Sequence, residues 1–194
     1  GGETDVEDVT GLEQGHEAPA GGGVVIEVAH PEGRIVDEAI VRPVVDDRAN
    51  GAKPELIIVH YTSMESTDAA LDRLTDPVAK VSSHYLIDEK GNIFTLVDEE
   101  KRAWHAGVSN WHGRERCNDF SIGIELEGSD FEAFTEIQYQ VLQTLTDTLQ
   151  ANYPIQDIQG HSDIAPGRKT DPGPYFDWQH YRAGLAFRNS QDQP

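Results

Sequence analysis

The stretch that decides the fold is LIIVHY at residues 56–61. It follows a Pro-containing loop at residues 51–54 and is much shorter than the roughly 18 apolar residues of a membrane-spanning helix. A short and continuously apolar run of this kind predicts a strand that is buried on both faces of a sheet. His60 stands at the end of this strand, where a polar ring needs a partner.

A second central strand is predicted at residues 121–126, where the side chains alternate in character. The apolar face holds Ile122, Ile124 and Leu126, and the opposite face holds Gly123, Glu125 and Glu127. Further strands are predicted at residues 24–26 and 155–160, and residues 35–45 form an extended or irregular stretch. Residues 84–87 and 92–97 flank a turn that contains Gly91, which is the pattern of a hairpin.

Three helices are predicted around these strands. Residues 66–76 begin at Ser66, which can cap a helix. Residues 136–152 follow a capping box formed by Thr135 and Gln138 and end before Pro154. Residues 178–187 form a closing helix. Together the elements predict an α/β fold with a single mixed central β-sheet flanked by α-helices.

The first 22 residues differ in composition from the rest of the chain. They are rich in Gly, Glu and Asp, and they cannot bury enough apolar surface to offset the entropy lost on ordering. We expect a disordered, acidic linker or tail at residues 1–22 and one domain at residues 23–194. The net charge of −20 makes nucleic acid an improbable partner, because such a surface repels phosphates. The one cysteine, Cys117, excludes a disulfide within the chain.

Two histidines and an aspartate could together bind a metal ion. His60 ends the first buried strand, His161 follows another short apolar stretch, and Asp171 comes ten residues later in a loop rich in Pro and Gly. Two imidazoles and one carboxylate leave a fourth position open on a tetrahedral zinc, as in catalytic sites. Two alternatives stay open: Asp163 competes with Asp171 as the third ligand, and His60 could be a hydrogen-bonded residue of the core.

Two further charged residues could take part in the chemistry. Glu125 lies on the polar face of a central strand, where a carboxylate is costly unless it is solvated or paired. It is either an exposed residue or the general base for a metal-activated water. Lys169 is either an ordinary surface lysine or a positive charge near a developing oxyanion.

Five motifs in the chain resemble those of a known family. They are VHYT at residues 59–62, SSHYL at 82–86, AWHAG at 103–107, NDFSIGIELE at 118–127 and GHSDIAPGRKTDPGP at 160–174. In this order they are similar to the type-2 N-acetylmuramoyl-L-alanine amidases, which include the AmpD and AmiD enzymes. Phage amidases and animal peptidoglycan recognition proteins are more distant relatives. The resemblance covers about residues 55–187.

The resemblance implies an activity and a set of site residues. The activity is zinc-dependent hydrolysis of the amide between the lactyl group of MurNAc, or anhydro-MurNAc, and L-alanine of peptidoglycan. It implies one zinc per chain, in a cleft at the sheet edge, held by His60, His161 and Asp171, with Glu125 as acid and base and Lys169 stabilising the intermediate. The candidates for substrate binding are Trp104, His105, Asn118 and His84.

The chain also departs from part of this family. In the phage branch the third ligand is a cysteine, and a tyrosine precedes the histidine that matches His84. Here Asp171 and Ser83 occupy these positions, so we expect Glu125 to take the role of that tyrosine.

The resemblance leaves two questions open. A non-catalytic peptidoglycan-binding module of the same fold is the alternative function. The AmpD-like branch recycles muropeptides in the cytoplasm, and the AmiD-like branch is exported and lipid-anchored. Residues 101–104 and 115–120 look like the first branch, whereas the compact segment at residues 56–86 and the acidic tail favour the second. We therefore expect a periplasmic protein, either free or held at the outer membrane by a lipid anchor, with the cytoplasm as the alternative location. We also expect a monomer.

Overall fold

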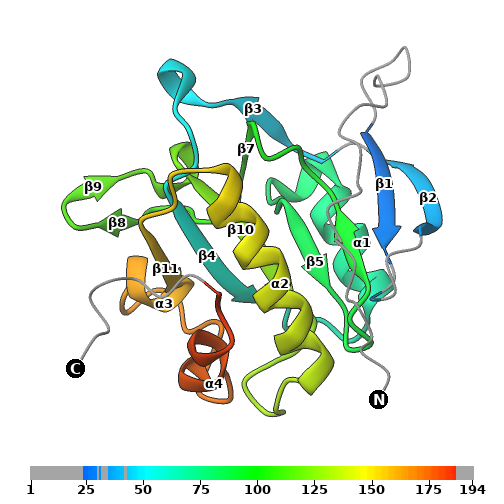
Figure 1. The fold of residues 1–194 in the computed structure, drawn as a ribbon. Helices are drawn as coiled ribbons and strands as arrows, with labels where there is room; N and C mark the ends of the chain where they lie inside the picture. The colour runs from blue at the N-terminus through cyan, green and yellow to red at the C-terminus, as the bar shows by residue number, and fades with distance from the viewer. Residues whose placement is uncertain (1–23, 30, 32–34, 42, 187–194) are drawn as a thin grey trace.

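The computed structural model describes residues 24–29, 31, 35–41 and 43–186 (Figure 1). The tail predicted at residues 1–22 lies outside them. The strands are β1 (Val24–Ala29), β2 (Ile35–Val41), β3 (Val45–Asp47), β4 (Leu56–Tyr61), β5 (Tyr85–Ile87), β6 (Ile93–Thr95), β7 (Lys101–Ala103), β8 (Asn110–Trp111), β9 (Arg114–Glu115), β10 (Ser121–Leu126) and β11 (Asp157–Gly160). The helices are α1 (Thr67–Thr75), α2 (Glu136–Asn152), α3 (His161–Ile164) and α4 (Trp178–Ala183), with short 3-10 turns η1 (Ala49–Gly51), η2 (Pro77–Ala79) and η3 (Cys117–Asp119).

One mixed sheet organises the chain. Its strand order is β11-β4-β10-β5-β6-β1-β2, and two small two-stranded sheets, β3-β7 and β8-β9, lie beside it. The four strands from β11 to β5 are parallel, whereas β6, β1 and β2 continue the sheet through antiparallel pairings. The carboxyl ends of the parallel strands therefore meet at one edge, which is where such sheets place their ligands.

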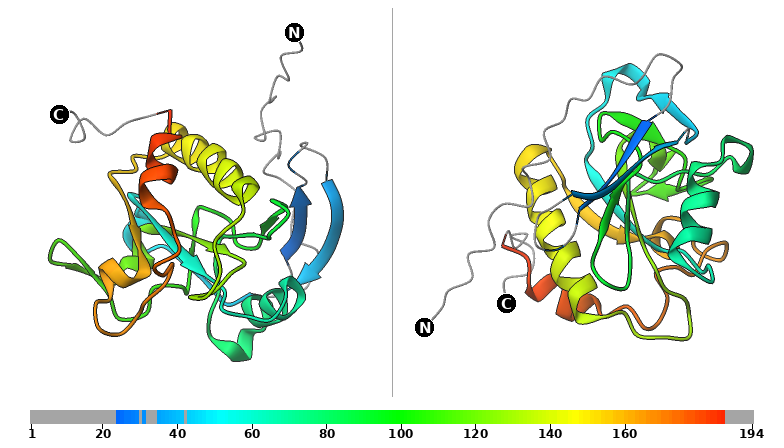
Figure 2. Two further views of the ribbon diagram at one scale, coloured as in Figure 1. Left: turned by 90° about the horizontal axis from the view of Figure 1, so that it is seen from below. Right: turned by 90° about the vertical axis from the view of Figure 1, so that its right-hand side faces the viewer.

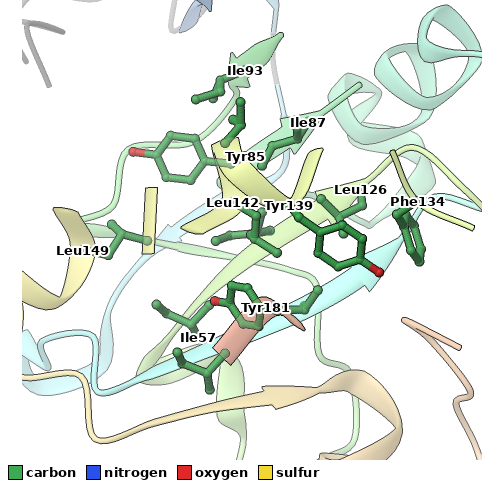
Figure 3. Close-up of a cluster of buried hydrophobic side chains, with 14 of the residues drawn as sticks. Ile57, Tyr85, Ile87, Ile93, Leu126, Phe134, Tyr139, Leu142, Leu149 and Tyr181 are labelled. Atoms are coloured by element: carbon green, nitrogen blue, oxygen red, sulfur yellow. The ribbon is translucent and has the colours of Figure 1, made fainter. Parts of the chain in front are cut away.

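Helices cover the two faces of this sheet, with α2 and α4 on one side and α1 on the other (Figure 2). The α2 side holds the largest apolar cluster, part of which is drawn in Figure 3. The face opposite carries two smaller clusters. Leu74 and Leu86 belong to the one under α1, and Ile58 and Phe120 belong to the other. The polar residues of the predicted site share this second face.

The long helix α2 confirms the prediction made for residues 136–152. The Thr135 side chain accepts a hydrogen bond from the Gln138 N–H at 3.3 Å, and the Gln138 side chain accepts one from the Thr135 N–H at 3.0 Å. This reciprocal capping satisfies two N–H groups that would otherwise lack partners. The Gln138 amide also donates to the Glu127 carbonyl at 2.9 Å, which ties the start of α2 to the end of β10.

Some boundaries differ from the sequence prediction. The closing helix, predicted at residues 178–187, ends at Ala183 with Gly184 as its C-cap, and the Gln143 side chain of α2 donates to the carbonyls of His180 and Tyr181 in its last turn. Helix α3, the 3-10 turns and the small strands β3, β7, β8 and β9 are not predicted from sequence, since four or fewer residues show no periodicity. Within the described ranges, no helix is both long and apolar enough to cross a membrane.

Candidate active site

The three predicted metal ligands converge at the carboxyl ends of β4 and β11. His60 is the fifth residue of β4, and His161 opens α3 directly after β11. Because β11 pairs in parallel with β4, with Gly160 opposite Val59, His161 lies beside His60. Nδ1 of His60 is 2.9 Å from Oδ2 of Asp171 and 3.0 Å from Nδ1 of His161, and the third distance, from His161 Nδ1 to Asp171 Oδ2, is 3.2 Å. We call these three buried residues the metal triad.

The hydrogen bonds of the outer ring nitrogens show that the metal triad fits a cation. His161 Nε2 lies 2.9 Å from the Ala106 carbonyl, which can only accept, so a neutral His161 carries its proton there and points a lone pair from Nδ1 at the triad. This lone pair faces the Asp171 carboxylate. Two hydrogen-bond acceptors at this distance repel each other unless a positive charge lies between them. Ligands of a tetrahedral zinc with bonds near 2.05 Å would be ~3.3 Å apart, close to the separations found.

Asp171, and not Asp163, completes the cluster. Asp163 is exposed, and its carboxylate accepts the Gly160 N–H at 2.8 Å, which caps the short helix α3. Burial alone would raise the pKa of Asp171, but the close contacts of its carboxylate with the His161 and His60 rings outweigh it and hold this pKa well below its usual range. Burial also lowers the pKa of His60 to about 4. The pair therefore presents an anionic carboxylate beside a neutral imidazole, as metal binding requires.

Glu125 lies directly across from His60 in the register of the parallel strands β10 and β4. Its side chain is on the same sheet face and is 8% exposed, so the alternative of an exposed strand residue does not hold. Oε2 is buried and has no hydrogen-bond partner among the described residues. Burial, with the negative charge of Asp171, raises the pKa of Glu125 well above its usual value. A carboxyl group that binds a proton this readily is suited to move one near neutral pH.

Two cations stand near this carboxyl group. The charges of Lys169 and Arg73 both lower the pKa of Glu125, which opposes the effect of burial. Both side chains are exposed, with Lys169 two residues before Asp171 and Arg73 on α1. The charge of Lys169 therefore favours the ionised form of Glu125.

The four residues predicted to bind substrate differ in accessibility. His84 is 0% exposed, and its two ring nitrogens face the Gly123 N–H and the Lys101 carbonyl. His105 and Asn118 are 5% and 6% exposed. Trp104 alone is half-buried, with its indole N–H donating to Asp46 at 2.8 Å. This placement favours a structural role for the three buried residues and leaves Trp104 as the accessible candidate.

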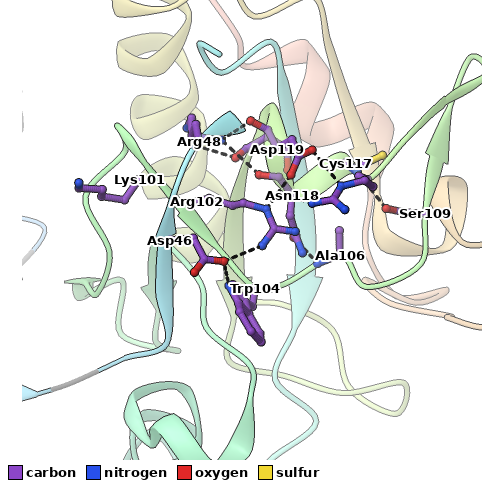
Figure 4. Close-up of polar contacts among 12 residues, drawn as sticks. Asp46, Arg48, Lys101, Arg102, Trp104, Ala106, Ser109, Cys117, Asn118 and Asp119 are labelled. Atoms are coloured by element: carbon purple, nitrogen blue, oxygen red, sulfur yellow. Dashed lines mark hydrogen bonds and ion pairs between the residues drawn. The ribbon is translucent and has the colours of Figure 1, made fainter. Parts of the chain in front are cut away.

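A buried arginine holds the loops behind the site together. Arg48 donates to four backbone carbonyls, those of Glu99, Asn118, Asp119 and Ser121, and Figure 4 draws part of this arrangement. Burial lowers the pKa of Arg48 to about 10, which still leaves it charged at neutral pH. Its bonds fix η3 and the start of β10 relative to β3.

Sequence reasoning does not single out three groups that contact the site. Ser121 lies against the His105 ring at 3.0 Å, the Ala106 carbonyl contacts His161, and Arg168 donates to that same carbonyl at 2.7 Å. The two-residue period of a strand places Ser121 on the same face as Glu125, so that signal is readable. The roles of a carbonyl group and of a loop arginine depend on loop conformation, which leaves no such pattern.

Comparison with known proteins decides the family. The model of the N-acetylmuramoyl-L-alanine amidase family matches residues 50–174. The chain belongs to this family. It is an amidase of peptidoglycan turnover, as the five motifs predicted.

Individual relatives support the assignment. The chain is 47% identical to 1,6-anhydro-N-acetylmuramyl-L-alanine amidase AmpD of Salmonella typhimurium, over 77% of this chain and 90% of that protein. A crystal structure of a selenomethionine AmpD derivative superposes with a TM-score of 0.70 at 44% identity, covering 75% of this amidase and 92% of AmpD. The Escherichia coli AmiD structure has a TM-score of 0.63 at 36% identity and covers 85% and 69% of the two chains.

The predicted periplasmic location is wrong. It depended on kinship with the exported AmiD branch, but Escherichia coli AmiD is 41% identical over 68% of this amidase and only 54% of its own length. The AmpD relatives are 44–47% identical over 86–90% of theirs. The compact segment between β4 and β5, which suggested the AmiD branch, therefore does not decide the location.

Proposed function

We propose that this amidase releases the stem peptide from muropeptides that carry 1,6-anhydro-MurNAc, using one zinc ion held by the metal triad. The observation that carries the proposal is the convergence of His60, His161 and Asp171 beside Glu125. The substrate class is supported by the AmpD relatives, named as 1,6-anhydro-N-acetylmuramyl-L-alanine amidases, and by the AmiD structure, whose substrate is anhydro-N-acetylmuramic acid-L-Ala-D-γ-Glu-L-Lys.

The donor set suits the chemistry of amide hydrolysis. Two imidazoles and one carboxylate leave a coordination position for water or substrate. When bound, zinc lowers the pKa of water toward about 7 and polarises a carbonyl group. Because the triad is buried, its charges act in a medium that screens them weakly.

Glu125 carries the proton in this scheme. Its Oε2, which has no hydrogen-bond partner among the described residues, accepts the proton of the attacking water as the oxygen adds to the amide carbonyl. The same oxygen then donates that proton to the leaving nitrogen of L-alanine. A pKa raised by burial makes both transfers accessible to one carboxyl group.

Lys169 completes the set by stabilising negative charge. The carbonyl oxygen becomes an oxyanion as water adds, and a nearby ammonium group lowers the energy of that state more than of the neutral amide. The Lys169 ammonium group has no hydrogen bond or ion pair with another described residue, so its charge is available to substrate.

Glu125→Gln and His161→Ala test the assignment together. We expect Glu125→Gln to retain zinc and to lose about 10²- to 10⁴-fold in turnover of an anhydro-muropeptide, because proton transfer is lost. His161→Ala should lose both zinc and activity. Metal analysis by mass spectrometry and chromatographic detection of the free peptide provide the two readouts.

Glu127→Gln is the matched control. Glu127 follows β10 on the same face, but its carboxylate accepts hydrogen bonds from the Thr67 hydroxyl and the Glu89 N–H, so activity should change little. Full turnover in Glu125→Gln, or in wild-type protein stripped of metal by a chelator, would contradict the proposal. Muropeptide binding without release of peptide would favour a binding module instead.

A further inference from the structure

The two histidines of the metal triad are bonded through their outer ring nitrogens to consecutive residues of one loop. His60 Nε2 lies 2.9 Å from Nδ1 of His105, and His161 Nε2 lies 2.9 Å from the carbonyl oxygen of Ala106. The loop follows β7 and reaches the triad on the sheet face that carries Glu125. A single dipeptide therefore contacts both imidazoles on the side away from the metal position.

We propose that His105 and Ala106 are positioning residues that fix the orientation and the proton placement of both ligand histidines, with Asn118 holding the dipeptide in place. This inference rests on the proposed function, because it concerns how the zinc ligands are prepared. It assigns to His105 and Asn118 a role other than substrate binding.

The hydrogen bonds allow only one arrangement of protons when the triad binds a metal. Nδ1 of His60 then needs a lone pair, so the ring proton is on Nε2 and is donated to His105 Nδ1. A neutral His105 consequently carries its own proton on Nε2, which lies 3.0 Å from the Ser121 hydroxyl oxygen. The chain from His60 through His105 to Ser121 thus selects the tautomer of His60 that can ligate zinc, as partners of metal-bound histidines commonly do.

The His105 ring occupies space that only a glycine at position 123 leaves free. A Cβ atom on Gly123, which lies on β10 between Ser121 and Glu125, would come within 2.5 Å of the His105 ring. The polar strand face therefore lacks a side chain at the one position that the ring covers. Ser121 is 0% exposed, so the far end of the chain is shielded from water.

Asn118 fixes the backbone of the dipeptide. Its side-chain oxygen accepts from the N–H groups of both His105, at 3.0 Å, and Ala106, at 2.8 Å, and Figure 4 shows Asn118 beside Ala106. On the other side, the Arg168 guanidinium donates to the Ala106 carbonyl at 2.7 Å. Ala106 is thereby held through both its N–H group and the carbonyl that orients His161.

The experiment measures zinc affinity by competition with a chromophoric chelator, and the absorption spectrum of the cobalt-substituted protein. We expect His105→Leu to bind zinc about 10- to 100-fold more weakly and to change the cobalt spectrum, since His60 loses its partner. His105→Asn should recover most of the affinity, because its Oδ1 can accept from His60 Nε2. Gly123→Ala should weaken binding by displacing the ring, without removing any polar group.

Tyr181→Phe is the control for a buried hydrogen bond lost elsewhere. The Tyr181 hydroxyl contacts the Thr146 hydroxyl on the other side of the sheet, and Tyr181 is 0% exposed. The substitution should therefore lower thermal stability and leave zinc affinity unchanged. Wild-type affinity and spectrum in His105→Leu, or no recovery in His105→Asn, would overturn the inference. Failure of the wild-type protein itself to bind zinc would instead overturn the proposed function.

Discussion

Glu125 and His60 show how much of the site a sequence can predict. The alternation of residues 121–126 places Glu125 on the polar face, and the apolar run of β4 ends at His60. The burial of Glu125 cannot be read from this pattern, because it depends on the loops that cover the second face. Likewise, only the return of the loop after α3 shows that Asp171, and not Asp163, joins the histidines.

Lys169 is expected to act on turnover and not on metal binding. Replacing it by Ala removes the ammonium charge proposed to stabilise the oxyanion, so kcat should fall by about 10²- to 10³-fold while zinc content stays the same. Lys90→Ala, which removes another exposed lysine, from the hairpin turn, should have no effect on either. A kcat of Lys169→Ala near that of wild type would exclude the role.

His84 should make the fold sensitive to acid. Burial and the charge of Arg48 lower its pKa to about 3, against 6.5 for the free side chain. Between these values the unfolded chain binds a proton that the folded chain rejects, so the stability of the fold decreases as the pH falls. The slope from this residue alone is about 1.4 kcal/mol per pH unit.

Denaturant unfolding of the metal-free protein between pH 6 and pH 4.5, inside the window between the two pKa values, checks this slope. His84→Gln should flatten the dependence of unfolding free energy on pH by about that amount, whereas His112→Gln, at an exposed histidine, should leave it as in wild type. Equal slopes in wild type and His84→Gln would show that His84 is protonated in the folded state.

At the scale of elements, the N-terminus of α2 joins the helix to the sheet. Besides capping α2, the Thr135 hydroxyl lies 2.8 Å from the Glu89 carbonyl in the β5-β6 turn. We expect Thr135→Ala to lower the unfolding free energy by about 1–2 kcal/mol, measured by chemical denaturation. Thr144→Ala removes a hydroxyl that donates only to the Gln140 carbonyl of the same helix, so it should lower the unfolding free energy by less. A larger cost for Thr144→Ala would contradict the assigned cap.

Elements with a long periodic pattern are predicted well, and short ones are not. The apolar spacing of α2 and its capping box indicate both of its ends, and the β5-β6 hairpin follows from Gly91 in its turn. By contrast, α3 has four residues, and β8 and β9 have two each. These short elements arise from contacts with distant segments, such as the bond from the Trp111 indole to Asp157, which no local window contains.

At the scale of the whole molecule, charge repulsion should oppose folding. The chain holds 35 acidic and 15 basic residues, and like charges on a compact surface destabilise it. Raising NaCl from about 0.05 M to about 1 M shortens the screening length to roughly 3 Å, so the melting temperature should rise. Calorimetry at the two salt concentrations measures this increase.

A variant with fewer charges separates repulsion from other effects of salt. Glu65, Asp72 and Glu132 are exposed, and changing all three to the matching amides should reduce the increase in melting temperature. An unchanged or larger increase in this variant would indicate that salt acts by a route other than screening.

The positions of the metal triad along the sequence make activity depend on the segment that follows the sheet. Its members stand at residues 60, 161 and 171, and the last two follow the final strand of the sheet. A fragment that stops after β11 would retain every strand of the sheet and one ligand, and a fragment that stops after α3 would retain two. Such a product of incomplete synthesis or proteolysis lacks at least one ligand, so we expect it to cut nothing. Activity therefore requires a chain that extends at least as far as Asp171.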